Sequence, residues 1–302
     1  MQTPIRPARR GTLLLFVVIH AVLITVVNLL LFANGTFHPL LAWTSGMVGG
    51  TLVVNAVLLV ILIGGICLWF GRLRPYDVGW IPAHLGAGAL ATLALWAAAQ
   101  VIHVLSGWLT HGQIALAPPL AAGGAVVLLG LLMGQVFGNA LFEELAYRGF
   151  LFPQLYLRIH GDGQQPWLRF LLTLLISQTI FALVHIPNRL YLGMTISEII
   201  PDLALLTVWG VLFTLIYLRT DNLFLVVGIH ALGNAPTTLF ATAPALQGSG
   251  ASLLIYALAA VGVFGLPLLL RAWQRRPRKP DAPGSQDEAG DGLMSGAMPE
   301  SL

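Results

Sequence analysis

The chain has 302 residues, of which 57% are hydrophobic and 9% are charged, and its mean hydropathy is +0.84. Soluble domains carry about 25% charged residues, so this composition excludes a soluble globular protein and predicts an all-α, polytopic membrane protein. The net charge of +3 does not indicate a nucleic-acid partner, because the basic residues lie at the ends of apolar runs and form no groove with aromatic residues. Membrane lipid is therefore the first partner that we expect.

Eight apolar runs are long enough to cross a membrane as helices, which takes about 20 residues. In chain order they cover residues 12–33, 47–70, 83–106, 119–142, 168–186, 203–218, 223–241 and 251–270. The fourth run is expected to continue as helix to residue 157. The basic start of the chain resembles a signal peptide, but the first run is too long and no A-x-A site closes it, so we expect a retained helix.

The basic residues predict an orientation for the bundle. Thirteen of the fifteen fall on one side of the expected spans: Arg6, Arg9, Arg10, Arg72, Arg74, Arg158, Arg169, Arg219, Arg271, Arg275, Arg276, Arg278 and Lys279. Only Arg189 falls on the other side, and Arg148 lies within a run. The positive-inside rule then places both termini in the cytoplasm of a plasma or inner membrane protein with an even number of spans.

The chain is expected to divide into four parts. Residues 1–118 would form the first three membrane helices, and residues 119–245 would form a core of four helices. Residues 246–276 would form the final membrane helix. Residues 277–302 are rich in Pro, Gly, Ser and acidic residues, which predicts a disordered cytoplasmic tail.

Glu143 and Glu144 are the only carboxylates inside any of the apolar runs. A carboxylate at bilayer depth costs several kcal/mol, so the pair indicates a functional site. Glu144 precedes Arg148 by four residues, which is the favourable order for an ion pair along a helix. Glu143 is rotated by about 100° from Glu144. We therefore expect Arg148 to hold Glu144 and to leave Glu143 available as a general base.

Two histidines lie deep in later apolar runs, and each has a partner four residues away. Phe181 precedes His185 and could pack against its imidazole ring. His230 precedes Asn234, so two N–H groups on one helix face could donate to an oxyanion at a scissile carbonyl. A lone histidine in a membrane helix usually makes an interhelical hydrogen bond and nothing more. The combination of polar groups from three runs favours a hydrolytic site over that structural interpretation.

Other classes of hydrolase lack their motifs in this sequence. A soluble zinc protease would show H-E-x-x-H on one helix, and a serine hydrolase would show a G-x-S-x-G turn; neither occurs. The runs contain no paired aspartates either, which argues against an aspartyl protease. For His20, which has no polar partner nearby in the sequence, a structural role is the preferred interpretation.

Three motifs occur in order: Glu143-Glu144-Leu-Ala-Tyr-Arg148, Phe181-Ala-Leu-Val-His185 and His230-Ala-Leu-Gly-Asn234. They resemble the E-E-x-x-x-R, F-x-x-x-H and H-x-x-x-N/D motifs of the CPBP intramembrane proteases. This family contains the type II CAAX prenyl endopeptidases and the bacteriocin-processing (Abi) enzymes. The resemblance extends over residues 120–241.

The resemblance implies roles for these residues. Glu143 and His185 would activate the attacking water, and His230 and Asn234 would stabilise the oxyanion. Glu144, Arg148 and Phe181 would support the site. The family is usually called a metalloprotease; a bound divalent metal such as zinc would be held by Glu143, His185 and His230, and the need for a metal stays open.

The resemblance predicts an endopeptidase that cleaves a membrane-associated or lipidated (CAAX-like) protein or a leader peptide. The alternative is a catalytically silent membrane immunity or scaffold protein of the same fold. The depth of the site poses a problem, because Glu143 lies late in an inward run and His185 lies late in an outward run. We expect Pro187 to mark a break within the membrane that brings the two residues to one depth.

Overall fold

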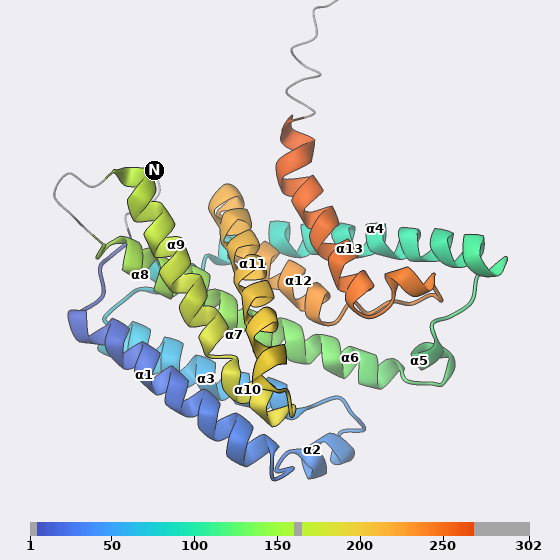
Figure 1. The fold of residues 1–302 in the computed structure, drawn as a ribbon, viewed down its shortest axis with the longest axis horizontal. Coiled ribbons are helices and arrows are strands. Elements are labelled where there is room, and N and C mark those ends of the chain that lie inside the picture. Colours follow the sequence, from blue (N-terminus) through green and yellow to red (C-terminus); the bar gives the residue numbers. More distant parts are fainter. Residues whose placement is uncertain (1–4, 160–164, 269–302) are drawn as a thin grey trace, which may run out of the picture.

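The computed structural model describes residues 5–159 and 165–268, which form helices and loops without a strand (Figure 1). Seven of the helices in these ranges are long and apolar enough to cross a membrane, and Leu223–Asn234 is a shorter apolar helix. The all-α fold and the multi-pass membrane protein that the composition predicts are thereby confirmed. The predicted tail, 277–302, and the end of the last predicted run lie outside the described residues.

The first half of the chain contains α1 (Arg10–Val26), η1 (Val27–Phe32), α2 (His38–Trp43), α3 (Gly50–Leu58), η2 (Leu59–Phe70), η3 (Pro75–Val78), η4 (Pro82–His84), α4 (Leu85–His111), α5 (Pro118–Ala121), α6 (Ala125–Met133), η5 (Gly134–Ala140), α7 (Leu141–Glu143), η6 (Glu144–Leu151) and α8 (Phe152–Tyr156). The second half contains α9 (Pro166–Leu183), α10 (Ile186–Tyr191), α11 (Ile196–Thr220), α12 (Leu223–Asn234), η7 (Pro244–Leu246), α13 (Ser249–Ala260) and η8 (Val261–Gly265). Segments η1, η2, η5, η6 and η8 are π-helical continuations of their neighbours, so α6 to α8 form one long helix.

Two predicted spans differ from the observed helices. The run 203–218 begins earlier, at Ile196, because Thr195 and Glu198 form a capping box at the start of α11. The run 223–241 ends as helix at Asn234, since Ala235 adopts φ −136° and ψ 80°, and Pro236 follows. The helix α12 is therefore too short to count among the seven spans.

The break that was expected near Pro187 lies slightly earlier in the chain. Helix α9 ends at Leu183, and His185 sits in the turn that starts α10. Pro187 is the second residue of α10, where its missing N–H costs nothing. The prediction that Pro187 ends the first helix is thus wrong, whereas the predicted break next to His185 is present.

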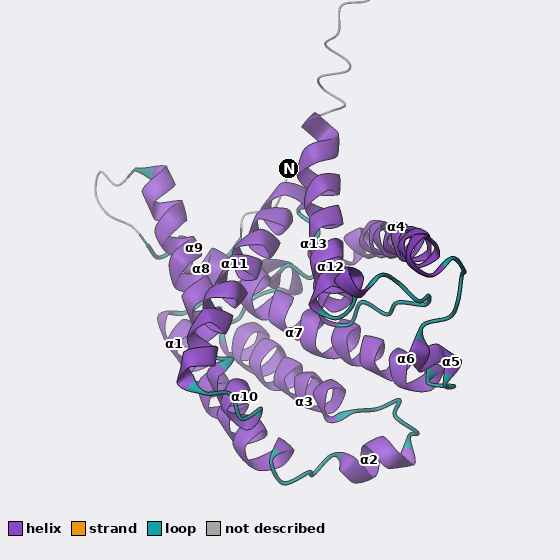
Figure 2. Ribbon diagram, turned by 45° about the vertical axis from the view of Figure 1, so that its right-hand side comes forward, coloured by secondary structure: helices purple, strands orange, loops and turns teal. Residues whose placement is uncertain are grey.

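The short helix α12 lies at the centre of the bundle. It packs against α4, α13 and η5, while α11 packs against α9 and α3 against η5. Figure 1 shows α9, α11 and α13 running steeply through the view, whereas α4, α6 and α12 run across it; Figure 2 shows the same bundle turned by 45°. Eight residues of α12 in succession, Val226–Gly233, are buried, so this helix is held on all sides.

Two glycines allow close approach around the long helix and α12. A Cβ on Gly149 would clash with the carbonyl oxygen of Val78, so η6 and the η3 turn meet backbone to backbone. A Cβ on Gly228 would clash with the side chain of Thr92, which permits α12 to lie directly on α4. Both positions require the smallest side chain, as in membrane helix interfaces generally.

The N-terminal segment is fixed against the far end of the long helix. The buried side chain of Gln154 accepts a hydrogen bond from the amide of Ala8 (2.7 Å) and donates one to the carbonyl of Arg6 (2.8 Å). Arg158 donates to the Ala8 carbonyl at 2.5 Å, and Asp77 accepts from the Arg6 amide at 3.1 Å. The arginine-rich ends of α1, η2 and α8 therefore lie together at one end of the bundle.

Candidate active site

Glu143 and Glu144 lie where α7 passes into η6, near the middle of the 32-residue helix Ala125–Tyr156. Glu144 is fully buried, whereas Glu143 retains 8% exposure and lines a cavity. The two neighbours therefore point in different directions, as the rotation per residue along a helix requires. The structure places Glu143 on the cavity wall and Glu144 behind it.

Glu144 is held by Arg148, at the spacing of four that the sequence predicts. The Arg148 Nη1 atom lies 3.2 Å from the Glu144 Oε1 atom, and both side chains are fully buried. Arg148 also donates from Nη2 to the Gly210 carbonyl at 3.2 Å and to Gln178 at 3.4 Å. Two aromatic rings flank the guanidinium carbon, at 4.7 Å (Phe181) and 5.4 Å (Phe213). These contacts fix the charge of Arg148 in a site that excludes water.

His185 faces Glu143 from the turn between α9 and α10. Its Nδ1 atom lies 2.7 Å from the carbonyl oxygen of Phe181, and its ring meets the Phe181 ring edge-on at 4.9 Å. A carbonyl only accepts hydrogen bonds, so Nδ1 carries the proton and the Nε2 atom of the neutral ring presents a lone pair. That Nε2 atom lies 3.6 Å from the Glu143 Oε1 atom.

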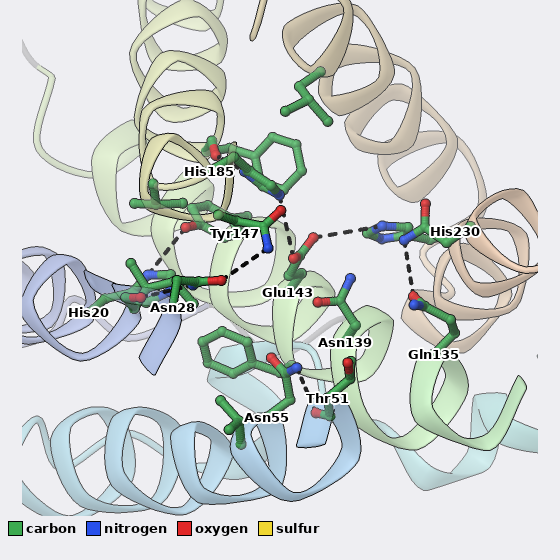
Figure 3. Close-up of a pocket in the computed structure, with 18 of the residues that line it drawn as sticks. His20, Asn28, Thr51, Asn55, Gln135, Asn139, Glu143, Tyr147, His185 and His230 are labelled. Atoms are coloured by element: carbon green, nitrogen blue, oxygen red, sulfur yellow. Dashed lines mark hydrogen bonds and ion pairs between the residues drawn. The ribbon is translucent and has the colours of Figure 1, made fainter. Parts of the chain in front are cut away.

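His230 faces the other oxygen of the same carboxylate from α12. Its Nε2 atom lies 3.6 Å from the Glu143 Oε2 atom, and its Nδ1 atom lies 2.7 Å from the Glu144 Oε1 atom. The ring stacks on Phe213 with centroids 4.9 Å apart. Figure 3 shows Glu143 between the two imidazoles. Glu144 thus connects Arg148 to His230 and sets the orientation of that ring.

Asn234 occupies the last turn of α12, at the edge of the cavity. Its amide nitrogen donates to the Gln135 side-chain oxygen at 3.0 Å, and the residue is exposed. His230 and Asn234 both line the cavity, as their spacing suggests, but each already has a partner on the long helix. One of the two amide N–H groups of Asn234 stays available.

The cavity has a volume of about 410 Å³, and its wall combines groups from the early and late parts of the chain. His20, Asn28, Asn55 and Asn139 line it together with Glu143. Asn28, Asn55 and Asn139 belong to none of the three motifs, although a carboxamide inside an apolar run is a signal that could have identified them. Such a polar cavity can hold the water that hydrolysis requires.

His20 has a polar partner that its sequence neighbours do not reveal. Its Nδ1 atom lies 3.2 Å from the hydroxyl of Tyr147, and both residues are buried at the cavity wall. Tyr147 also meets Phe181 edge-on at 4.9 Å. These contacts join α1 to the long helix next to Glu143, so the N-terminal span supports the site even though it carries no motif.

The donor set suits a metal in its chemistry. A carboxylate and two imidazole Nε2 atoms face one another, and each imidazole is oriented by an acceptor on Nδ1, as is usual for metal-bound histidine. The two Nε2 atoms approach different oxygens of Glu143, however. Among the described residues no group of three or more His, Cys, Asp or Glu side chains is gathered closely enough to form a metal centre. As placed, these side chains do not fit a bound metal.

Residues 125–236 match the family described as type II CAAX prenyl endopeptidase Rce1-like. This range contains all three motifs, from Glu143 to Asn234, and confirms the resemblance to the type II CAAX prenyl endopeptidases. Comparison with curated proteins and with solved structures gives no match.

Proposed function

We propose that this chain, whose residues 125–236 match the Rce1-like family of type II CAAX prenyl endopeptidases, is an intramembrane protease that hydrolyses a peptide bond by activating water on Glu143 and His185. The observation that carries this proposal is the position of one carboxylate between two imidazole rings. Each Nε2 atom lies 3.6 Å from a Glu143 oxygen at the wall of a polar cavity.

Glu143 and His185 suit the activation of a water molecule. The separation of 3.6 Å between Nε2 and Oε1 is longer than a direct hydrogen bond, so a water can lie within reach of both acceptors. As its oxygen bonds to the scissile carbonyl carbon, the water gives one proton to Glu143. Glu143 then donates that proton to the leaving amine as the C–N bond breaks.

His230 and Asn234 are the proposed donors to the oxyanion. Because Glu144 accepts the Nδ1 proton of His230, the Nε2 atom can donate only when the ring is an imidazolium. The His230 ring lies between the two carboxylates, with Nε2 3.6 Å from Glu143 Oε2 and Nδ1 2.7 Å from Glu144 Oε1. Asn234 would contribute its second amide N–H. Glu144 and Arg148 act as positioning residues for His230.

The substrate that we propose is a membrane-associated or lipidated protein, or a leader peptide. A second cavity, of about 750 Å³ and almost entirely apolar, lies between α4, α6 and α12. Leu93, Leu129 and Val227 are among the residues that line it. Such a groove suits a lipid chain. A prenylated peptide should then be cleaved faster than its unmodified form, and a larger residue at Leu93 should reduce the difference.

The orientation is also part of the proposal. Arg6, Arg74 and Arg158 lie together at the end of the bundle where Ala8 contacts Gln154, so we propose that the termini are cytoplasmic. The cavity is lined from the opposite helix ends, by Asn28 of η1 and Thr51 of α3. In this orientation the cavity opens toward the extracytoplasmic face. Labelling of single cysteines placed at Thr36 and at Arg219 by an impermeant reagent tests this directly.

A catalytically silent immunity or scaffold protein is not favoured, since all six polar motif positions are present and four of them, Glu143, Glu144, Arg148 and His230, form one buried network. The test compares membranes that contain the wild-type protein with membranes that contain Glu143→Gln, and identifies new peptide ends by mass spectrometry. New ends should appear with the wild type alone. An identical set of ends in both membranes contradicts the proposal. Chelation followed by metal addition, on the same substrate, decides whether a metal takes part.

A further inference from the structure

Arg189 places a cation on the wall of the reaction cavity, one helical turn beyond His185. Its amide donates to the carbonyl of His185 at 3.0 Å, so the backbone holds the two residues in a fixed relation. Arg148, the cation behind the carboxylates, is fully buried and does not line the cavity. Of these two arginines, Arg189 is therefore the one that a substrate in this cavity would contact.

The guanidinium is held from two sides. Its Nε atom lies 2.7 Å from Asp202 Oδ2, and its Nη1 atom donates to the side-chain oxygen of Asn188 at 2.7 Å. Asn188 in turn donates to Asn28 at 3.0 Å, which ties this group to the end of the first span. A guanidinium has five N–H donors, and these bonds use two of them. The remaining donors, including both on Nη2, make no hydrogen bond to the described part of the chain.

The alternative is a purely structural role for Arg189, as a surface ion pair with Asp202 that joins α10 to α11. Exposed pairs of this kind contribute little, and the Arg189 side chain is only 17% exposed. Arg189 lines the cavity and Asp202 does not, so a molecule bound in the cavity would contact the positive charge and not the negative one. Arg189 therefore brings its unused donors to the cavity wall, whereas Asp202, whose side chain is 28% exposed, does not line the cavity.

We propose that Arg189 binds a carboxylate of the substrate about two or three residues from the scissile bond and so determines specificity; this inference rests on the proposed function. Arg189 lies four residues beyond His185, which is about 6 Å along a helix, and its side chain reaches further. An extended peptide advances about 3.3–3.6 Å per residue, so this distance corresponds to two or three substrate residues between the scissile bond and the carboxylate. A planar guanidinium with paired donors matches a carboxylate better than it matches a neutral amide.

The carboxylate can be the C-terminus of the substrate or an acidic side chain, and peptides can distinguish the two. The series starts from a peptide that the wild type cleaves and truncates it so that its C-terminal carboxylate falls one to five residues after the cleaved bond. Each member is also made with an amidated C-terminus. A further set is amidated and carries Asp at each position on either side of the cleaved bond in turn.

The wild type should prefer a carboxylate at the second or third position over the amide by about tenfold or more in kcat/KM. Arg189→Gln should remove this preference, and Arg189→Lys should retain part of it. Asp202→Asn is the matched control, because it breaks the same ion pair and keeps the cation. It should keep the full preference or increase it. Unfolding temperatures of all variants show that they are folded.

Three results overturn the assignment while leaving the proposed function intact. The first is a wild type that cleaves the carboxylate and amide peptides equally. The second is a preference that survives Arg189→Gln. The third is a preference that Arg189→Gln and Asp202→Asn reduce alike, since the pair then acts only on the structure. The opposite outcome is also distinguishable. If cleavage survives Glu143→Gln but still depends on the substrate carboxylate and on Arg189, the proposed mechanism is contradicted and Arg189 is supported as a binding residue.

Discussion

The buried pair of Glu144 and Arg148 gives the sharpest prediction about stability. Arg148→Met shortens the side chain and removes its charge, so the fully buried Glu144 keeps only His230 as a hydrogen-bond partner. Removing one partner of a buried ion pair costs about 3–5 kcal/mol. The hydrogen bonds from Arg148 to Glu144 and to the Gly210 carbonyl, at 3.2 Å each, are consistent with this size.

The double variant isolates the charge. In Glu144→Gln the side-chain oxygen can still accept the Nδ1 proton of His230, whereas the carboxylate charge is gone. Arg148→Met should therefore cost about 2 kcal/mol less in the Glu144→Gln background than in the wild type. The assay is reversible unfolding in mixed micelles, followed by fluorescence. An equal cost in both backgrounds, or a cost below about 1 kcal/mol in the wild type, would refute the reasoning.

Three smaller predictions follow from contacts around the site. Gly149→Ala should destabilise the protein, since its Cβ would clash with the Val78 carbonyl, whereas Gly134→Ala meets nothing within 4 Å and should be neutral or slightly stabilising; thermal unfolding of both decides. Tyr147→Phe should lower the free energy of unfolding by about 1 kcal/mol, because it removes the hydroxyl bonded to His20 and keeps the ring packed on Phe181. A loss as large as that of Tyr147→Ala would show that the hydroxyl, and not the ring, provides the stability. Burial alone would raise the pKa of Asp77, which lies between two spans, but hydrogen bonds from Arg74 and Arg6 lower it below its ordinary range. The charged form of Asp77 therefore stabilises the fold at pH values above its ordinary pKa, and this contribution is lost as pH falls through the lowered pKa. The difference in unfolding free energy between the wild type and Asp77→Asn should shrink over that acidic range. A difference that stays constant with pH would contradict this prediction.

Contacts within one helix could be predicted from the sequence. The spacing of four between Glu144 and Arg148, and between Phe181 and His185, gives the observed pairs directly, because a helix places such residues on one face. Hydropathy likewise located the seven long spans, since lipid requires that length of apolar helix.

Contacts between helices could not be read in the same way. Glu144 and His230 are 86 residues apart, and nothing local indicates that α12 turns His230 toward that carboxylate. Nor does any motif mark Asn28, whose place in the cavity wall depends on how η1 packs against α10. Hydropathy also overextended the run 223–241, since it does not register that Pro236 ends the helix.

The most direct test of the central claim is peptide cleavage by purified protein in lipid vesicles, with wild type, Glu143→Gln and Glu198→Gln measured side by side. Glu198 is an exposed carboxylate whose capping box accepts Gln equally well, so this variant controls for the loss of a charge. Glu143→Gln should abolish cleavage, whereas Glu198→Gln should retain the wild-type rate. Cleavage by Glu143→Gln at the wild-type rate would contradict it.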